Sequence, residues 1–261
     1  MPRIPDAAPR RDLNVFYVLD TSGSMEGEPI QILNRTMQET LRALEKVAGS
    51  TADAQIKLSV LQFASQVKWM HANGPEDVRN VRWINLSAGG LTQIGAAIRE
   101  LNKKLTNKEF MKSEVGSLLP IIIFMTDGHP TDEYMAALDE IKQNKLYRRA
   151  TKIGFAVGEY ADVQMIAHLT GDSEAVINTS DLGVFAKLLQ FVSVTSSIMG
   201  STSTTANAPG SAGREAVRQA LEESGINKDD VTPGFSYYNP EVADYRTADS
   251  ADVWEDIDDD W

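Results

Sequence analysis

Cysteine is absent from the sequence, which excludes disulfides, thiolate zinc sites, iron–sulfur clusters and a cysteine nucleophile. Histidine is almost as scarce: the chain has His71, His129 and His168, and none lies in a HExxH spacing. A histidine-rich metal site is therefore disfavoured. Any metal chemistry has to come from the oxygen atoms of Asp, Glu, Ser and Thr.

Long apolar runs are also lacking. The longest one, Leu118–Met125, is interrupted by Pro120 and is far too short to span a bilayer. The first twelve residues contain Arg and Pro but no apolar segment like that of a secretory signal. We therefore expect a cytoplasmic protein without a membrane partner.

Basic charge is in short supply, and the excess of acid is unevenly distributed. The net charge of the chain is −12, and residues 201–261 alone hold 14 Asp or Glu against 4 Lys or Arg. The rest of the chain is close to neutral and has no basic stripe, which disfavours nucleic acid as a partner. The last 61 residues are predicted to form an acidic tail.

Strands and helices are expected to alternate along the first 200 of the 261 residues. Short apolar runs predict six strands, at 13–19, 56–63, 67–71, 121–125, 153–157 and 175–177. Apolar residues spaced three and four apart predict helices at 29–47, 94–105, 133–146, 162–169 and 185–192. This order favours a doubly wound α/β fold, with a mostly parallel six-stranded sheet and helices on both faces. The strand near 67–71 is expected to be an antiparallel edge.

Three parts of the chain are distinguished by composition. Residues 1–11 form an N-terminal extension, residues 12–200 the α/β domain, and residues 201–261 a Ser/Thr-rich linker followed by a flexible acidic tail. A short helix over 214–223, closed by Gly225, is expected within this last part. The segment Trp254–Trp261 combines carboxylates with aromatic residues. One hypothesis is that it docks on the metal site of its own chain or of a second copy; the alternatives are that it docks on a partner or contacts nothing.

Oxygen-bearing side chains gather where predicted strands end. Asp20, Ser22 and Ser24 follow the first strand in alternate positions, and Asp127 follows the strand at 121–125. Thr92 follows Gly89-Gly90, just before a predicted helix. Neighbouring parallel strands would bring these loops to one edge of the sheet, where open α/β folds bind ligands. A site made of oxygen atoms alone suits Mg²⁺, with Mn²⁺ or Ca²⁺ as alternatives.

On these residues the chain resembles a von Willebrand factor A domain with a metal-ion-dependent adhesion site. The family pattern is Asp-x-Ser-x-Ser, a distant Thr and a distant Asp, and the resemblance covers about residues 12–200. It implies that Ser22, Ser24 and Thr92 bind the metal directly or nearly so. It also implies that Asp20 and Asp127 bind directly or through water, and that an Asp or Glu of a protein partner completes the coordination.

The absence of a signal sequence makes the layout look most like the cytoplasmic, bacterial TerY-like branch. That branch is associated with tellurite resistance and stress response, and its members are similar to partners of a protein phosphatase and a protein kinase. Some members carry a cysteine-rich metal module after the domain, and this chain has none.

Enzyme motifs are missing around the first strand. Haloacid-dehalogenase-like phosphotransfer needs a second Asp where Ser22 stands, and a nucleophile elbow needs Gly where Asp20 stands. We therefore expect no enzyme, with two alternatives left open: a Mg²⁺-dependent phosphohydrolase and a scaffold with a structural metal. Two neighbours of the site are ambiguous. His129 either faces the metal or bonds to the backbone, and Asp132 is either an extra ligand or a helix N-cap.

Overall fold

The computed structural model describes residues 10–51, 54–202, 211–227 and 230–233. One sheet runs through these residues, with the strand order β3-β2-β1-β5-β6-β7-β8 and with β4 also paired to β2. The strands are β1 (Arg11–Asp20), β2 (Ala54–Phe63), β3 (Val67–Trp69), β4 (Glu76–Asp77), β5 (Ile121–Thr126), β6 (Thr151–Val157), β7 (Val176–Thr179) and β8 (Thr232–Pro233). The pairs among β2, β1, β5, β6 and β7 are parallel, whereas β3, β4 and β8 pair antiparallel.

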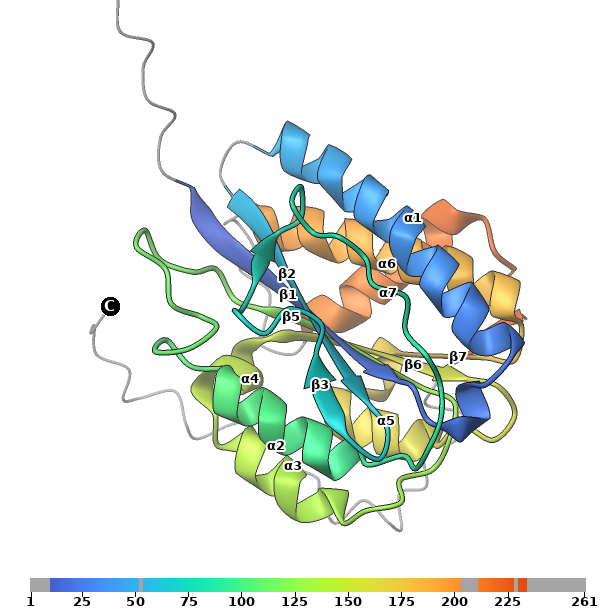
Figure 1. Ribbon diagram of the computed structural model, residues 1–261. Helices are drawn as coiled ribbons and strands as arrows, with labels where there is room; N and C mark the ends of the chain where they lie inside the picture. The colour runs from blue at the N-terminus through green and yellow to red at the C-terminus, as the bar shows by residue number, and fades with distance from the viewer. Residues whose placement is uncertain (1–9, 52–53, 203–210, 228–229, 234–261) are drawn as a thin grey trace, which may run out of the picture.

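Helices cover both faces of this sheet (Figure 1). On one face lie α1 (Glu28–Ser50), α6 (Leu182–Ser201) and α7 (Ser211–Ser224); on the other lie α2 (Ile94–Lys104), α3 (Tyr134–Lys142), α4 (Lys145–Arg149) and α5 (Val163–Thr170). Alternate residues of β1 point into the two cores: Val15 and Tyr17 toward α1 and α6, Phe16 and Val18 toward α2 and α5. The predicted doubly wound α/β class is confirmed, and so is the antiparallel edge strand near 67–71.

The predicted helix over 133–146 is wrong in one respect, because two helices occupy this range. Asn144 lies between α3 and α4 and caps α4, since its side-chain oxygen accepts from the backbone N–H groups of Leu146 and Tyr147. Its side-chain nitrogen donates to Asn102 and to the carbonyl of Leu105. An Asn side chain that bonds the backbone in this way stops one helix and starts the next.

The predicted boundary at residue 200 does not mark the end of the folded body. In α7, Ala216, Val217 and Ala220 are buried in the same core as α1 and α6. Farther along, β8 pairs with β7. The expected helix at 214–223 is present, and it is part of the packed body. The prediction of a linker and flexible tail from residue 201 onward is therefore wrong for the described residues 211–227 and 230–233. The segment Trp254–Trp261 lies outside the described residues.

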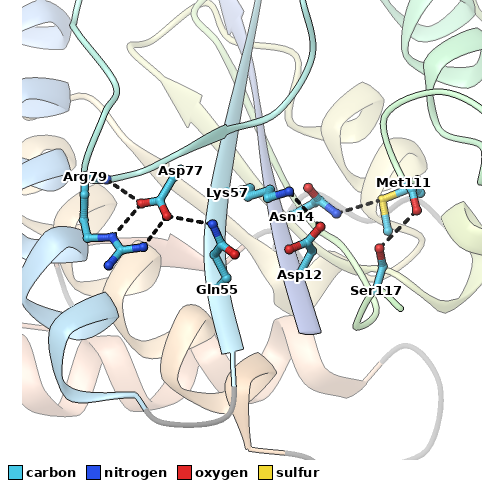
Figure 2. A network of polar contacts seen from close by, with 8 residues as sticks. All are labelled: Asp12, Asn14, Gln55, Lys57, Asp77, Arg79, Met111 and Ser117. Carbon is cyan, nitrogen blue, oxygen red and sulfur yellow. Dashed lines mark hydrogen bonds and ion pairs between the residues drawn. The ribbon is translucent and has the colours of Figure 1, made fainter. Parts of the chain in front are cut away.

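The end of the sheet opposite the carboxyl ends of the strands is held by polar contacts (Figure 2). Lys57 Nζ lies 2.8 Å from a carboxylate oxygen of Asp12, which joins β2 to β1. Asp77 accepts from Gln55 and from Arg79, which joins β4 to β2 and fixes the following loop. α6 ends at this side too, because a Cβ on Gly200 would touch Leu13 and Ile121.

Among the described residues, one helix, α6, is long and apolar enough to cross a membrane by length and composition. Its most apolar 18-residue window has a mean hydropathy of 1.5 and is 44% buried within the fold. It packs against α1, α7 and the sheet. The core helix of a soluble domain passes the same test of length and composition, so α6 is weak evidence for a membrane span.

Candidate metal centre

Asp20 occupies the last position of β1 and is fully buried. One carboxylate oxygen accepts the backbone N–H of Ser22 at 2.7 Å, and the other accepts the hydroxyl of Thr126 at 2.5 Å. Thr126 is the last residue of the neighbouring strand β5 and follows Met125, the register partner of Leu19. The carboxylate is therefore fixed between the ends of two adjacent parallel strands.

The two serines link this carboxylate to a second one. Ser24 lies in the single turn η1 (Gly23–Met25), and its Oγ is 3.0 Å from that of Ser22. The Ser24 hydroxyl also donates to Asp127 at 2.7 Å. Ser22 is buried, Ser24 is exposed and Asp127 is half-buried, so this chain of oxygens runs from the sheet outward to solvent.

Thr92 is brought in by a third loop. The backbone N–H of Gly23 donates to the carbonyl of Gly90, and Thr92 exchanges two hydrogen bonds with Thr131, one from each backbone N–H. A Cβ on Gly128 would lie 3.6 Å from the Ser24 hydroxyl and 3.8 Å from the Thr92 hydroxyl. Both hydroxyls therefore approach the same point beside Gly128. The structure brings together all five residues that the sequence singled out.

Threonine residues that the sequence analysis missed support the site. Besides bonding Asp20, the Thr126 hydroxyl accepts the backbone N–H of Gly128, which shapes the turn after β5. Thr131 holds Thr92, and the Thr21 hydroxyl donates to the carbonyl of Phe63. A Thr at the end of a strand is common, so only the β1–β5 register could have revealed the role of Thr126.

Burial raises the pKa of Asp20 above its ordinary value, although the hydrogen bonds from Thr126 and Ser22 work against this rise. Burial likewise raises the pKa of Asp127, against the hydrogen bond from Ser24. No Lys, Arg or His in the described part of the chain forms an ion pair with either carboxylate. Two neighbouring carboxylates without a cationic partner would be stabilised by a bound cation.

The donor set fits a hard divalent cation. It consists of two carboxylates and three hydroxyls, without nitrogen or sulfur, which suits Mg²⁺, Mn²⁺ or Ca²⁺. Within the described ranges, no group of three or more His, Cys, Asp or Glu could hold a metal ion. A metal here would thus depend on the serine and threonine oxygens. The exposed side of Ser24 and Asp127 leaves room for a ligand from outside.

Neither of the two ambiguous neighbours joins this set. The ring of His129 is exposed, and its Nδ1 lies 3.3 Å from a carboxylate oxygen of Asp162, so a contact with this side chain takes the place of the expected bond to the backbone. Asp132 accepts the backbone N–H groups of Gly95 and Ala96 at 3.0 and 2.9 Å. One of the two interpretations was that Asp132 caps a helix N-terminus. It does so, but the helix is α2 and not α3, which follows Asp132 in the sequence.

Comparison with known proteins agrees with this geometry. The family model of the von Willebrand factor type A domain matches residues 14–191. A human protein, inter-alpha-trypsin inhibitor heavy chain H6, is 25% identical over 184 residues, which are 66% of this chain and 13% of the human protein.

Solved structures show the same fold at low identity. Proximal thread matrix protein 1 from the mussel byssus, with a zinc-occupied MIDAS motif, superposes with a TM-score of 0.54 and 16% identity over 71% of this chain and 48% of that one. A von Willebrand factor type A protein from Catenulispora acidiphila superposes with a TM-score of 0.51 and 15% identity, over 71% of this chain and 42% of that one. The pilus adhesin SpaC from Lactobacillus rhamnosus GG superposes with a TM-score of 0.53 and 11% identity, over 71% of this chain and 30% of that one. This chain thus spans less than half of each of these proteins.

Proposed function

Because this chain belongs to the von Willebrand factor type A domain family, we propose that it is a metal-dependent protein-interaction module. A divalent cation at the end of β1 and β5 binds an Asp or Glu of a partner protein, and so bridges the two. The protein's own ligands are Asp20, Ser22, Ser24, Thr92 and Asp127. The observation that carries the proposal is a pair of carboxylates without a cationic partner among the described residues, joined by hydroxyls that lead out to solvent.

We propose Mg²⁺ as the physiological ion, with Mn²⁺ and Ca²⁺ as alternatives. Mg²⁺ prefers oxygen ligands and six-fold coordination, and it commonly retains waters that a partner carboxylate can displace. The mussel protein carries zinc at its motif, so the ion is part of what has to be measured. If one of the two carboxylates acts through water, the cation stays short of negative charge, which favours an acidic partner.

The setting we propose follows the family resemblance. We propose a bacterial, cytoplasmic TerY-like role in stress response, in a complex with a protein phosphatase and a protein kinase, from the order of the metal motif along the chain; the cysteine-rich module of some members of that branch has no counterpart here. We propose no catalytic role for this chain. Ser22 and Ser24 hydrogen bond to each other, to Asp20 and to Asp127, and not to a Lys or His that would act as a base in the described part of the chain.

Affinity purification tests this proposal. The tagged full-length chain is used to capture proteins in Mg²⁺ or in EDTA, beside Asp20→Ala and Asp127→Ala. Asp139→Ala is the matched control, because Asp139 is exposed on α3, away from the site. We expect specific partners only with Mg²⁺ and only with wild type and the control.

Two results would point elsewhere. Partners retained in EDTA by all the variants would indicate a structural metal or none, provided that circular dichroism shows each variant folded. Phosphate release from a phosphomonoester that needs Mg²⁺ and is lost in Asp20→Ala would favour the phosphohydrolase.

A further inference from the structure

A groove of about 690 Å³ opens beside the candidate metal centre, at the carboxyl ends of β6 and β7. His129, two residues after Asp127, forms its wall on the metal side. Residues of the loop after β6, of the start of α5 and of the segment that follows β7 also line it, and so does Asp230. Because β5 lies next to β6 in the sheet, a segment bound at the metal reaches the groove without leaving the edge of the sheet.

The groove is acidic. Glu159, Asp162, Asp181 and Asp230 line it, and among the described residues that line it His129 is the one basic residue. Two of the carboxylates are compensated, since Asp162 and Asp181 accept backbone N–H groups at the N-termini of α5 and α6. Glu159 and Asp230 accept no such backbone N–H and form no ion pair within the described part of the chain. A cationic side chain therefore fits the groove better than a neutral or acidic one.

The other side of the metal centre presents one exposed apolar side chain. Leu91, directly before Thr92, is 53% exposed, and its backbone N–H donates to Ser65, just after β2. Since β2, β1, β5, β6 and β7 are consecutive, Leu91, the metal centre and the groove follow one another along one edge of the sheet. Tyr160, 79% exposed, adds a large ring beside the groove. A bound segment would thus meet an exposed leucine on one side of the metal and the acidic groove on the other.

We propose that the partner recognised by this module is a segment whose metal-binding Asp or Glu has a Lys or Arg on one flank and an apolar residue on the other. The cationic side chain enters the groove toward Glu159 and Asp230, and the apolar one contacts Leu91. This inference rests on the proposed function, because the metal anchors the segment. The acidic groove then selects among acidic segments that the metal alone would not distinguish.

A peptide array tests this selectivity. Each 12-residue peptide has one central Asp or Glu, with flanks that are basic, neutral or acidic, and apolar or polar. The tagged full-length chain is applied in Mg²⁺ and in EDTA, and the strongest peptides are titrated in solution. We expect EDTA-sensitive binding to be about two- to fivefold tighter for a basic flank than for a neutral one, the range of one partly exposed ion pair.

A charge reversal connects that preference to the groove. Glu159→Lys should abolish or invert the preference for a basic flank, while the response of the melting temperature to Mg²⁺ stays unchanged. Glu39→Lys is the matched control, because it makes the same charge change at an exposed position on α1.

The outcomes separate the two proposals. EDTA-sensitive binding that ignores the flanks, or a preference that persists in Glu159→Lys, overturns the groove and leaves the metal-dependent module standing. Absence of EDTA-sensitive binding to any acidic peptide counts against both.

Discussion

Asp127 and Asp20 illustrate how a carboxylate can oppose folding at the position where it is needed. Burial raises the pKa of both groups, so in the absence of metal the ionised form is less stable in the folded chain than in the unfolded one. The protonated carboxyl groups do not carry this cost, so the folded chain gains stability from them that is fully present below the pKa that they have in the unfolded chain. This stability is lost as the pH rises through the higher pKa that they have in the folded chain. A bound cation reverses this penalty.

Asp127→Asn is expected to separate metal binding from folding. Asn keeps an oxygen that can accept from Ser24 but lacks the charge, so stability without metal should stay within about 1 kcal/mol of wild type or rise slightly. Wild type should gain about 2.7 kcal/mol when Mg²⁺ reaches 100 times its dissociation constant, and the variant much less. Thermal melts with EDTA or MgCl₂ measure both effects, with Asp139→Asn as control. An undiminished Mg²⁺ response in Asp127→Asn would remove Asp127 from the ligand set.

Asp77 shows the opposite behaviour at the other end of the sheet. Hydrogen bonds from the Arg79 guanidinium lower its pKa to about 2, with help from Gln55 (Figure 2). A lowered pKa means that the stabilisation is present above the ordinary value of 3.8 and is lost as the pH falls toward 2.

Asp77→Asn should therefore lower the free energy of unfolding by about 1 kcal/mol at pH 7, since Arg79 is half exposed and solvent screens the pair. The difference from wild type should shrink below pH 4. Urea unfolding between pH 7 and pH 3 measures it. A difference that stays constant over this range would assign the stabilisation to packing instead of charge.

At the scale of elements, the packing of α7 relies on close contact between its backbone and β6 more than on large apolar side chains. A Cβ on Gly213 would lie 2.1 Å from the carbonyl oxygen of Lys152 in β6, so a glycine lets the helix backbone rest on the strand. Ala216 and Ala220 continue this surface with small side chains. Arg214 adds ion pairs to Asp172 and Glu174, beside the start of β7.

Gly213→Ala is expected to destabilise the protein by about 1–3 kcal/mol, because the backbone of β6 cannot move away as a flexible side chain could. Gly49→Ala is the control. Gly49 lies in α1 with open space around its Cβ position, and alanine there should be neutral or stabilise by up to about 1 kcal/mol. Chemical denaturation compares the two variants with wild type. Equal effects at both positions would show that α7 does not pack as tightly on β6 as described.

At the scale of the molecule, the folded body extends past the family match at residue 191 to β8. A chain that ends at Thr202 loses α7 and β8 and uncovers apolar surface of the core that α1 and α6 share.

We expect that fragment to be less stable than the full chain by roughly 3 kcal/mol or more, and to bind hydrophobic dyes. Urea unfolding of this fragment and of the full chain measures the difference, and equal stability would mean that α7 and β8 do not stabilise the core.

The sequence by itself determined the α/β class, the alternation of strands and helices and the five oxygen-bearing residues, because these depend on local runs and on loops that follow strands. Tertiary structure alone decided that Thr126 holds Asp20, since this contact joins residues 106 positions apart through strand register. The same holds for Asp132, which caps α2 instead of its own helix. Tertiary structure also decided that α7 belongs to the core. Glycine and alanine give a weak apolar pattern in the sequence, and they stabilise the packing only where a strand lies directly against the helix.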